Sequence, residues 1–288
     1  MSRVIQQSSR FAAITGAGSG LGRDIALGLA TKGYQVFGTA ITSEEITDLQ
    51  QASGGAVTLT RCDITDDPAV KRWALDVSAQ TEGSLNLLIS NAGILTPGPI
   101  ETLPLDSIKR EFEVNVFGAL SVMNAFLPAL RKVRGRIVQI STWTAHLPLP
   151  FNGPSGASKA AMEVFATVYR EELKRFGIDV VVAVAGNMRT GGPAKTASAL
   201  ARTAERMTSQ ERDLYGNAFS AFATKLNSMQ DNGLASVDAA QRVIEIAEQN
   251  PAPRFAAVGQ DTEEILRVVR EKSDDEQDAL RLQIVGLR

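Results

Sequence analysis

Short apolar runs alternate with longer amphipathic stretches along the chain from Phe11 onward. Runs of strand length separated by stretches of helix length are typical of βαβ units, which place their strands in a parallel sheet. We therefore predict an α/β fold with a doubly wound parallel sheet of about seven strands. The predicted strands are Phe11–Thr15, Gln35–Ala40, Val57–Arg61, Leu85–Ser90, Gly135–Ile140, Asp179–Ala185 and Phe255–Val258.

The amphipathic stretches predict helices, because their apolar positions recur at the spacing of one helix face. Gly177 suits the C-terminal cap of one helix. The acidic run Asp274–Glu276 suits the solvated first turn of another helix near the C-terminus. A break is expected near the start of the longest segment. The predicted helices include Arg23–Lys32, Ala69–Gln80, Leu105–Leu130 and Ala157–Phe176.

The region 191–233 breaks this alternation, since it is rich in Ala, Thr, Arg and Met and predicts one or two helices between the sixth and seventh strands. An insertion at this point lies over the carboxyl ends of the strands, where open α/β sheets bind ligands. We predict that residues 191–233 form a substrate lid. It belongs to a single domain, residues 11–288, which follows a flexible leader at residues 1–10.

Composition narrows the possible partners. The net charge of -2 provides no basic surplus for a phosphate backbone, so no nucleic-acid partner is predicted. The chain has one cysteine, Cys62, and one histidine, His146, which excludes an internal disulfide and argues against a metal site. The N-terminus lacks the apolar core of a signal peptide, and we expect no later segment to be apolar for long enough to span a bilayer. A cytoplasmic protein without a membrane partner is predicted.

The first predicted strand runs directly into a glycine-rich segment, Thr15–Arg23, and then into a helix. This order is what a dinucleotide loop requires, because glycines let the backbone approach a pyrophosphate at a helix N-terminus. The glycines follow the spacing TGxxxGxG rather than GxGxxG. The loop residues predicted to hold the cofactor are Gly16, Ser19, Gly20, Leu21 and Gly22.

From this loop to Thr190 the chain resembles the short-chain dehydrogenases/reductases, whose motifs recur in order. Cys62-Asp63-Ile64 resembles the segment that faces the adenine, Ser90-Asn91-Ala92-Gly93 an NNAG motif with its first Asn replaced, and Ala185–Thr190 a PGxxxT motif without its proline. The resemblance implies a Rossmann-like fold and a nicotinamide dinucleotide. The tail is similar to that of the longer steroid- and retinol-dehydrogenase-like members. The further cofactor residues that it implies are Ile41, Asp63, Ile64, Asn91, Ala92, Gly93, Lys159, Gly186, Met188 and Thr190.

The resemblance also implies a catalytic set with one departure. The family's YxxxK frame falls on Ser155 and Lys159, so a serine stands where the family has its proton-donating tyrosine. Thr142 falls on the hydroxyl that polarises the carbonyl, and Asn115 on the asparagine that orders a water chain. A serine hydroxyl reaches less far than a phenol and is a much weaker acid. The catalytic residues predicted on this basis are Asn115, Thr142, Ser155 and Lys159.

Four explanations of Ser155 stay open. The proton source has moved to another group, such as His146, Tyr215 or a water ordered by Thr142 and Ser155. The chain has become a non-redox catalyst, for instance a cyclase, isomerase or dehydratase. It binds the dinucleotide without catalysis. Or the serine is an engineered replacement in an ordinary reductase.

The choice of nicotinamide depends on the end of the second strand, where the family's acidic position falls on Ala40 and its basic position on Ile41. Without a carboxylate near the ribose nothing repels a 2′-phosphate, which favours NADP(H) over NAD(H). Thr39, Thr42 and Ser43 offer hydroxyl donors there. The predicted reaction is oxidoreduction of a bulky, apolar carbonyl, alcohol or enone, because the lid supplies mainly apolar side chains.

Assembly is implied by the resemblance alone. Family members pair through the helices after the fourth and fifth strands, here Leu105–Leu130 and Ala157–Phe176. A homodimer or homotetramer is therefore expected.

Overall fold

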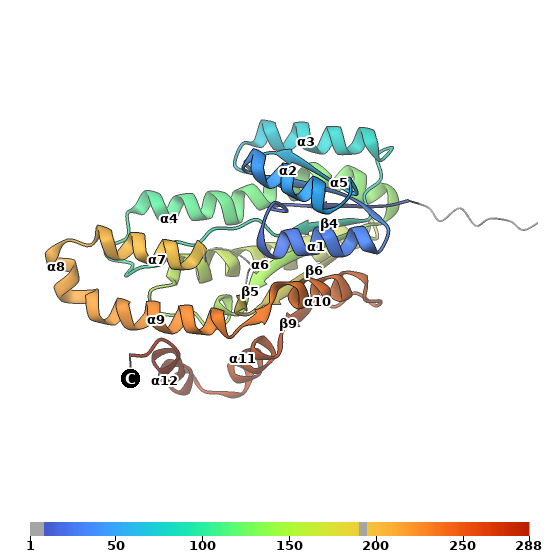
Figure 1. Cartoon of the computed structure of the whole chain (residues 1–288). Helices are drawn as coiled ribbons and strands as arrows, with labels where there is room; N and C mark the ends of the chain where they lie inside the picture. Colours follow the sequence, from blue (N-terminus) through green and yellow to red (C-terminus); the bar gives the residue numbers. More distant parts are fainter. Residues whose placement is uncertain (1–8, 190–194, 288) are drawn as a thin grey trace, which may run out of the picture.

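The computed structural model describes residues 9–189 and 195–287 and places seven parallel strands in one sheet (Figure 1). Their order, β3-β2-β1-β4-β5-β6-β9, reverses direction between β1 and β4, as in a doubly wound fold. All seven predicted strands are confirmed, with small shifts at their ends. They are β1 (Arg10–Ile14), β2 (Tyr34–Ala40), β3 (Val57–Arg61), β4 (Leu87–Ser90), β5 (Arg136–Thr142), β6 (Asp179–Ala185) and β9 (Phe255–Val258).

Helices cover both faces of the sheet because alternate strand residues point to opposite sides. Ala12 and Ile14 of β1 belong to the apolar cluster that includes α1 (Gly20–Thr31) and α10 (Ser236–Glu248). Ala13 belongs to the opposite cluster. The helices of that second face are α3 (Asp67–Gln80), α5 (Ala119–Val133) and α6 (Gly153–Lys174).

The long segment predicted as Leu105–Leu130 contains the expected break. It is divided into α4 (Leu105–Phe112), a π-helical turn (Glu113–Gly118) and α5. The run Leu105–Val133 is long and apolar enough to cross a membrane, so the expectation that no segment reaches that length is wrong. In this fold the run is mostly buried, and Phe126 of α5 packs edge-on against Trp73 of α3 at 4.8 Å between ring centroids.

The insertion before β9 is helical, with more helices than the one or two predicted, and a short parallel strand pair outside the main sheet joins it to α10 (Ser236–Glu248). β7 (Met188–Arg189) pairs with β8 (Leu234–Ala235) at its base. In Figure 1, α7 runs beside α4, and α9 leads back toward α10. The helices of the insertion are α7 (Lys195–Arg206), α8 (Ser209–Glu211), a π-helical turn (Arg212–Gly216) and α9 (Asn217–Asp231).

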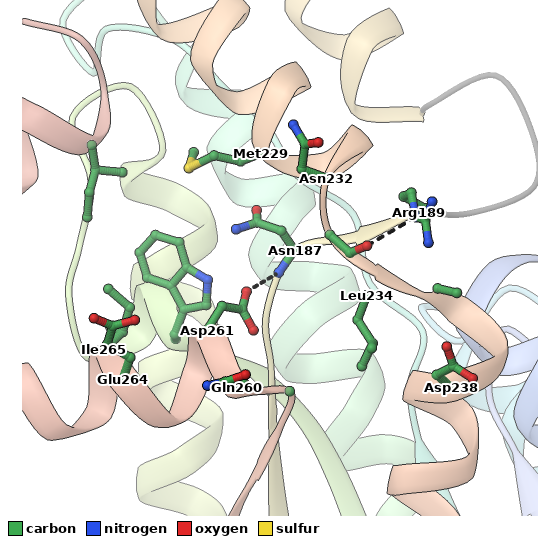
Figure 2. Close-up of a pocket in the computed structure, with 15 residues that line it drawn as sticks. Asn187, Arg189, Met229, Asn232, Leu234, Asp238, Gln260, Asp261, Glu264 and Ile265 are labelled. Carbon is green, nitrogen blue, oxygen red and sulfur yellow. Dashed lines mark hydrogen bonds between the residues drawn. The ribbon is translucent and has the colours of Figure 1, made fainter.

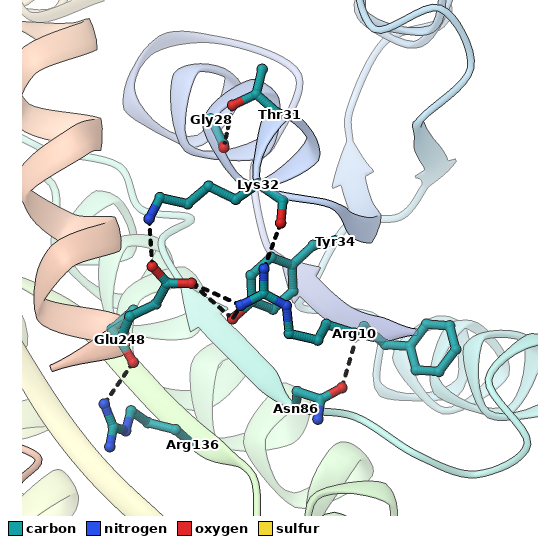
Figure 3. Close-up of polar contacts among 10 residues, drawn as sticks. Arg10, Gly28, Thr31, Lys32, Tyr34, Asn86, Arg136 and Glu248 are labelled. Atoms are coloured by element: carbon teal, nitrogen blue, oxygen red, sulfur yellow. Dashed lines mark hydrogen bonds and ion pairs between the residues drawn. The ribbon is translucent and has the colours of Figure 1, made fainter. Parts of the chain in front are cut away.

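The predicted helix start near the C-terminus and the predicted leader at the N-terminus have different outcomes. The helix start at Asp274 is confirmed, since Ser273 caps α12 (Asp274–Ile284) after α11 (Gln260–Glu271). The predicted leader lies mainly outside the described residues, and its boundary is wrong at Arg10, which already belongs to β1. The guanidinium of Arg10 pairs with Glu248 at 3.1 Å and lies over the ring of Tyr34 (Figure 3). These contacts hold the first strand to α10.

Candidate active site

The glycine loop between β1 and α1 is shaped for close approach of a ligand. Gly16 has a φ of +65°, and a Cβ at Gly22 would collide with the carbonyl of Gly16 and lie 2.5 Å from Asn91 Nδ2. The loop therefore needs glycine at both positions. Ser19 occupies the N-cap position of α1 without a side-chain capping hydrogen bond, so the first N–H groups of the helix face the loop. This cradle fits a pyrophosphate, as the sequence predicts for Gly16, Ser19, Gly20, Leu21 and Gly22.

Asn91, which follows β4, ties its strand end to this loop. Its Nδ2 donates to the carbonyls of Thr15 (3.0 Å) and Gly16 (3.3 Å). The Thr15 hydroxyl in turn accepts from the backbone N–H groups of Asn91 (2.9 Å) and Ala92 (3.0 Å). The structure thus brings two predicted segments together at the point where the strand order reverses.

At the end of β2 the sequence predicts neutral surroundings, but two charged side chains lie there. Glu45 of α2 (Ser43–Ala52) accepts from the backbone N–H groups of Ile41 (3.2 Å) and Thr42 (3.4 Å). A Cβ at Gly18 would lie 2.7 Å from the Glu45 carboxylate. Arg61, at the end of β3, donates to the carbonyl of Ile41 at 3.2 Å. The premise that no carboxylate lies near the ribose end is therefore wrong.

The hydroxyls proposed for the same corner are largely engaged. Thr39 is buried and its hydroxyl accepts from the N–H of Gly16 at 3.0 Å, while Thr42 caps α2 by accepting from Glu45 N at 3.2 Å. Farther along, Asp63 pairs with Arg110 at 2.9 Å, and Ile64 is buried beside it.

Asn115 lies in the π-helical turn, is buried, and joins three elements. Its Oδ1 accepts from the N–H of Ile94 at 2.8 Å. Its Nδ2 faces the carbonyl of Ile94 (2.9 Å), the hydroxyl of Ser158 (3.0 Å) and the carboxyl of Glu111 (3.3 Å). The asparagine therefore connects the end of β4 to the first turns of α6.

Lys159 lies on α6 and points to the ends of β4 and β5. Its Nζ donates to the carbonyl of Ile140 at 3.0 Å, and a Cβ at Gly93 would lie 3.4 Å from Nζ and 3.2 Å from Asn115 Oδ1. Desolvation lowers the pKa of Lys159 to about 8, and the charges of Glu111 and Glu163 act in the opposite direction. The structure thus brings Asn115, Gly93 and Lys159 together.

Thr142 lies at the end of β5 and Ser155 in the first turn of α6, the helix that carries Lys159. Thr142 ends β5 and its hydroxyl accepts from the N–H of Thr144 at 3.4 Å. A Cβ at Gly156, next to Ser155, would lie 2.7 Å from the carbonyl oxygen of Thr144, so the start of α6 packs directly on this turn. Ser155 is half-buried, four residues before Lys159 on the same helical face.

The two side chains considered as replacement proton donors lie next to carboxylates. The contact of Tyr215 is a hydrogen bond, whereas that of His146 is a close approach without one. His146 Nε2 lies 3.0 Å from Glu163 Oε2, and Ser141 donates to the same carboxylate. The hydroxyl of Tyr215 donates to the carboxylate of Glu101 at the surface of the insertion. Neither contact involves Ser155.

The segment after β6 lies beside a cavity of about 600 Å³ (Figure 2). The N–H of Asn187 donates to Asp261 at 3.1 Å, and a Cβ at Gly186 would collide with this carboxylate. The cavity is lined by Trp143 and by the segments 232–235 and 259–261, among others, but not by Asn115, Ser155 or Lys159. Met188 lies in β7, whereas Thr190 falls outside the described residues.

Sequence reasoning missed a cation at the glycine loop. Lys195, the first residue of α7, donates from Nζ to the hydroxyl of Ser19 at 2.9 Å. The two residues are far apart in sequence, so no local pattern indicates the contact. It places a positive charge from the insertion at the predicted pyrophosphate cradle.

The comparisons with known proteins agree on one family. A family model described as short chain dehydrogenase matches residues 10–201. The NADPH-dependent 1-acyldihydroxyacetone phosphate reductase of Schizosaccharomyces pombe is 32% identical over 64% of this chain and 62% of its own length. Human retinol dehydrogenase 5 is 33% identical over 77% of this chain and 70% of its own length. The first of these relatives is thus matched over less than two thirds of its length.

Solved structures share the fold over nearly the whole chain. A short-chain dehydrogenase from Streptomyces avermitilis has a TM-score of 0.75 and 24% identity, covering 98% of this chain and 97% of its own. One from Burkholderia cenocepacia J2315, solved in complex with NADP, has a TM-score of 0.72 and 24% identity, covering 98% and 99%. The seven-stranded architecture described above is therefore that of these proteins.

Proposed function

We propose, because the chain belongs to the short-chain dehydrogenase/reductase family, that it is an NAD(P)(H)-dependent oxidoreductase with an atypical active site, in which Ser155 stands in the place of the family's tyrosine. The observation that carries the proposal is the meeting of the glycine loop, Asn91, Asn115 and Lys159 at the carboxyl ends of neighbouring strands. Ligands of doubly wound sheets bind at this point.

The bound nicotinamide supplies or accepts the hydride. The chain contributes the rest: the loop Gly16–Gly22 and the N-terminus of α1 hold the pyrophosphate, with Lys195 adding a charge. Lys159 is proposed to bind the nicotinamide ribose, and Thr142 to donate its hydroxyl to the substrate oxygen. Asn115 forms hydrogen bonds to the backbone of Ile94 and to the first turns of α6, and so holds these two segments of the site in a fixed relative position.

Ser155 limits this chemistry. General acid-base help is typically worth about 10²–10⁴-fold in rate, and a serine hydroxyl offers little of it. We propose that the native chain turns over a carbonyl, alcohol or enone slowly unless another group supplies the proton. The alternatives are a non-redox catalyst on the same scaffold, a silent dinucleotide-binding protein, or an engineered Tyr-to-Ser variant. All three alternatives are suggested by the same observation, the absence of a phenol at position 155.

The proposed dinucleotide is NADP(H), with NAD(H) second. Arg61 lies at the ribose end of β2 and offers a cation for a 2′-phosphate. Two relatives are named as NADPH-dependent reductases, from Schizosaccharomyces pombe and Ornithobacterium rhinotracheale. The Glu45 carboxylate opposes the preference, because it occupies the backbone N–H groups of Ile41 and Thr42 and repels a phosphate.

The proposed substrate has a bulky apolar body. Phe151, before α6, packs against Phe219 and Phe222 of α9, with ring centroids 5.8 and 5.5 Å apart. Apolar side chains therefore join the insertion to the segment that leads into α6, the helix that carries Ser155. Relatives named retinol dehydrogenase 5 and estradiol 17-beta-dehydrogenase 2 support this class. A cavity of about 480 Å³ between α4 and α7 adds Ile94 and Leu95 to the apolar surface, with arginines also lining it.

The remaining expectations are proposals as well. A homodimer or homotetramer is supported by exposed apolar side chains on the π-helical turn and α6, among them Phe117, Phe165 and Val168. We also propose a cytoplasmic location, the lid role of residues 191–233, and no nucleic-acid or membrane partner.

Calorimetric titration of the protein with NADPH, NADP⁺, NADH and NAD⁺ tests the proposed function. We expect saturable binding of at least one pair, lost in the variant Gly22→Val. Consumption of NAD(P)H with a panel of bulky ketones and enones then tests the redox step. Absence of binding for all four dinucleotides at millimolar concentration would contradict the proposal.

A further inference from the structure

The cavity of about 480 Å³ between α4 and α7 has a charge that the proposed function does not use. The chain as a whole carries a net charge of -2, yet three arginines and one aspartate line this cavity. Its floor is apolar and includes Leu95 and Ile94, the latter with an exposed fraction of 42%. A ligand in this cavity therefore meets an apolar surface and a positive charge together. The charged lining residues are Arg110, Arg202, Arg206 and Asp106.

Two of the arginines extend from one face of α7, the helix that runs beside α4 in Figure 1. The residues of α7 that line the cavity recur at the three- and four-residue spacing of a single helical face: Ala199, Arg202, Thr203 and Arg206. The hydroxyl of Thr203 donates to the carbonyl of Pro97 at 2.8 Å, which holds this face against the floor of the cavity. The fold therefore sets the positions from which Arg202 and Arg206 extend.

The third arginine and the aspartate already have partners of opposite charge. Arg110 of α4 pairs with Asp63 at 2.9 Å and also donates to the hydroxyl of Thr65 at 2.9 Å. Asp106 pairs with Lys109 at 3.2 Å within the same helix. Because the charges cancel within each of these ion pairs, the excess positive charge of the cavity belongs to α7.

Arg202 and Arg206 carry that excess charge. Neither forms an ion pair or a side-chain hydrogen bond within residues 9–189 and 195–287. The acidic residue of the same helical turn, Glu205, does not line the cavity. A guanidinium stays charged in proteins, and its planar fork of N–H donors matches the oxygens of a carboxylate or a phosphate. Two such groups one helical turn apart form a donor set for an oxyanion.

The floor of the cavity begins beside the proposed reaction centre. A Cβ at Gly93 would lie 3.4 Å from Lys159 Nζ, and the next residue, Ile94, already lines the cavity. The N–H of Ile94 donates to Asn115 Oδ1 at 2.8 Å. From Ile94 to Pro97 the floor extends by at most about 11 Å, because consecutive Cα atoms are about 3.8 Å apart. A ligand held beside Lys159 thus reaches α7 with an apolar body of moderate length.

We propose that the substrate of this site is an amphiphile, whose apolar body carries the reacting carbonyl or hydroxyl group and ends in a carboxylate or phosphate bound by Arg202 and Arg206. The inference rests on the proposed function for the reacting group, and it narrows the proposed substrate class to apolar molecules with an anionic end. The binding of the anion itself requires neither dinucleotide nor turnover. A neutral ketone of the same shape gains nothing from the two arginines.

Calorimetric titration of the whole chain, with no dinucleotide added, compares three probes of equal chain length: octanoate, octyl phosphate and octanol. We expect at least one of the two anions to bind about tenfold more tightly than octanol. Tighter binding of octanoate alone identifies the anionic end as a carboxylate, and tighter binding of octyl phosphate alone identifies it as a phosphate. Octanol that binds as tightly as both anions, or no binding of either anion, would overturn the proposal.

The double variant Arg202→Gln/Arg206→Gln locates the effect. It should remove the preference for the anions while octanol binding and thermal unfolding stay unchanged. The matched control is Arg212→Gln/Lys225→Gln, which removes two exposed charges of the same insertion that do not line the cavity. This control should keep the preference. Equal losses in the two double variants would assign the preference to general charge and overturn the proposal.

These titrations separate the inference from the proposed function. A chain that binds the anions but no dinucleotide keeps the anion site and loses the redox role, whereas the opposite result overturns the inference alone. If the chain consumes NAD(P)H, benzoylbutyrate should have a KM about tenfold below that of its methyl ester. Only the KM of the acid should rise in Arg202→Gln/Arg206→Gln. An unchanged KM of the acid in this variant would contradict the proposed substrate.

Discussion

The ammonium of Lys195 donates a hydrogen bond to the hydroxyl of Ser19, which links the first turn of α7 to the glycine loop at 2.9 Å. The insertion thus contributes directly to the surface where the pyrophosphate is proposed to bind. We expect Lys195→Gln to weaken dinucleotide binding by about tenfold, since one charge-assisted contact is lost. Calorimetric titration at low and moderate salt measures the effect.

The matched control for Lys195 is Lys225→Gln, an exposed lysine on α9 of the same insertion. Its substitution should leave binding and salt dependence unchanged. Equal losses for Lys195→Gln and Lys225→Gln would show that general charge, rather than the contact with Ser19, assists the ligand.

Cofactor choice should respond to two opposed charges beside Ile41. Glu45→Gln keeps the capping interaction of α2 and removes the repulsion, so NADP(H) affinity should rise by about tenfold relative to NAD(H). Arg61→Gln should lower NADP(H) affinity by a similar factor. Competition binding with both dinucleotides measures the ratio. A ratio that stays constant in both variants would exclude this corner as the selectivity determinant.

The buried Glu111 should make stability depend on pH. Its pKa is raised from the ordinary 4.5 to about 7, so between these values the folded state binds more protons than the unfolded state. The contribution of Glu111 to the free energy of unfolding is therefore greatest below about pH 4.5 and is lost as the pH rises through 7. Glu111→Gln should not show this loss. The difference in the free energy of unfolding between Glu111→Gln and the native chain should therefore change by about 2 kcal/mol in favour of the variant from pH 5 to pH 8. Urea unfolding at both values measures it; a pH-independent difference would contradict the assignment.

Assembly should depend on the exposed apolar surface of α6. Phe165→Glu combined with Val168→Glu should convert the proposed oligomer to monomer in sedimentation at micromolar concentration, because two charges would be buried at the interface. Leu214→Glu, at an apolar and more exposed position of the insertion, should leave the assembly intact. A native chain that sediments as a monomer would remove the dimer proposal.

How far the sequence predicted this fold depended on the kind of pattern. Strands buried on both faces, such as β6, stand out as continuous apolar runs, which is why their positions were found. The π-helical turn around Asn115 was anticipated only as a break, since hydrophobic spacing does not distinguish it from other interruptions.

Charged residues that reach the site from other elements were harder to find. Lys195 meets Ser19 only through tertiary structure. Glu45 had a usable signal, because Thr42 and Glu45 have the spacing of a capping box, which folds the carboxylate back onto the strand end. Glu111 also had one, as it stands one helical turn before Asn115. The motifs of the family indicate only the positions within them, and Lys195, Glu45 and Glu111 lie outside those motifs.

The proposed function depends above all on Ser155 standing in the place of the family's tyrosine. The activity of Ser155→Tyr with NAD(P)H and a panel of bulky ketones tests this assignment directly. Ser155 and Lys159 share a helical face, and the start of α6 packs on the turn after Thr142, so a tyrosine there regains the reach and acidity that serine lacks. We predict that ketone reduction rises by about 10²–10⁴-fold over the native chain and is lost again in Ser155→Tyr combined with Lys159→Met. If Ser155→Tyr binds the dinucleotide but reduces no ketone, while the native chain converts a substrate of its own, the site serves a different reaction.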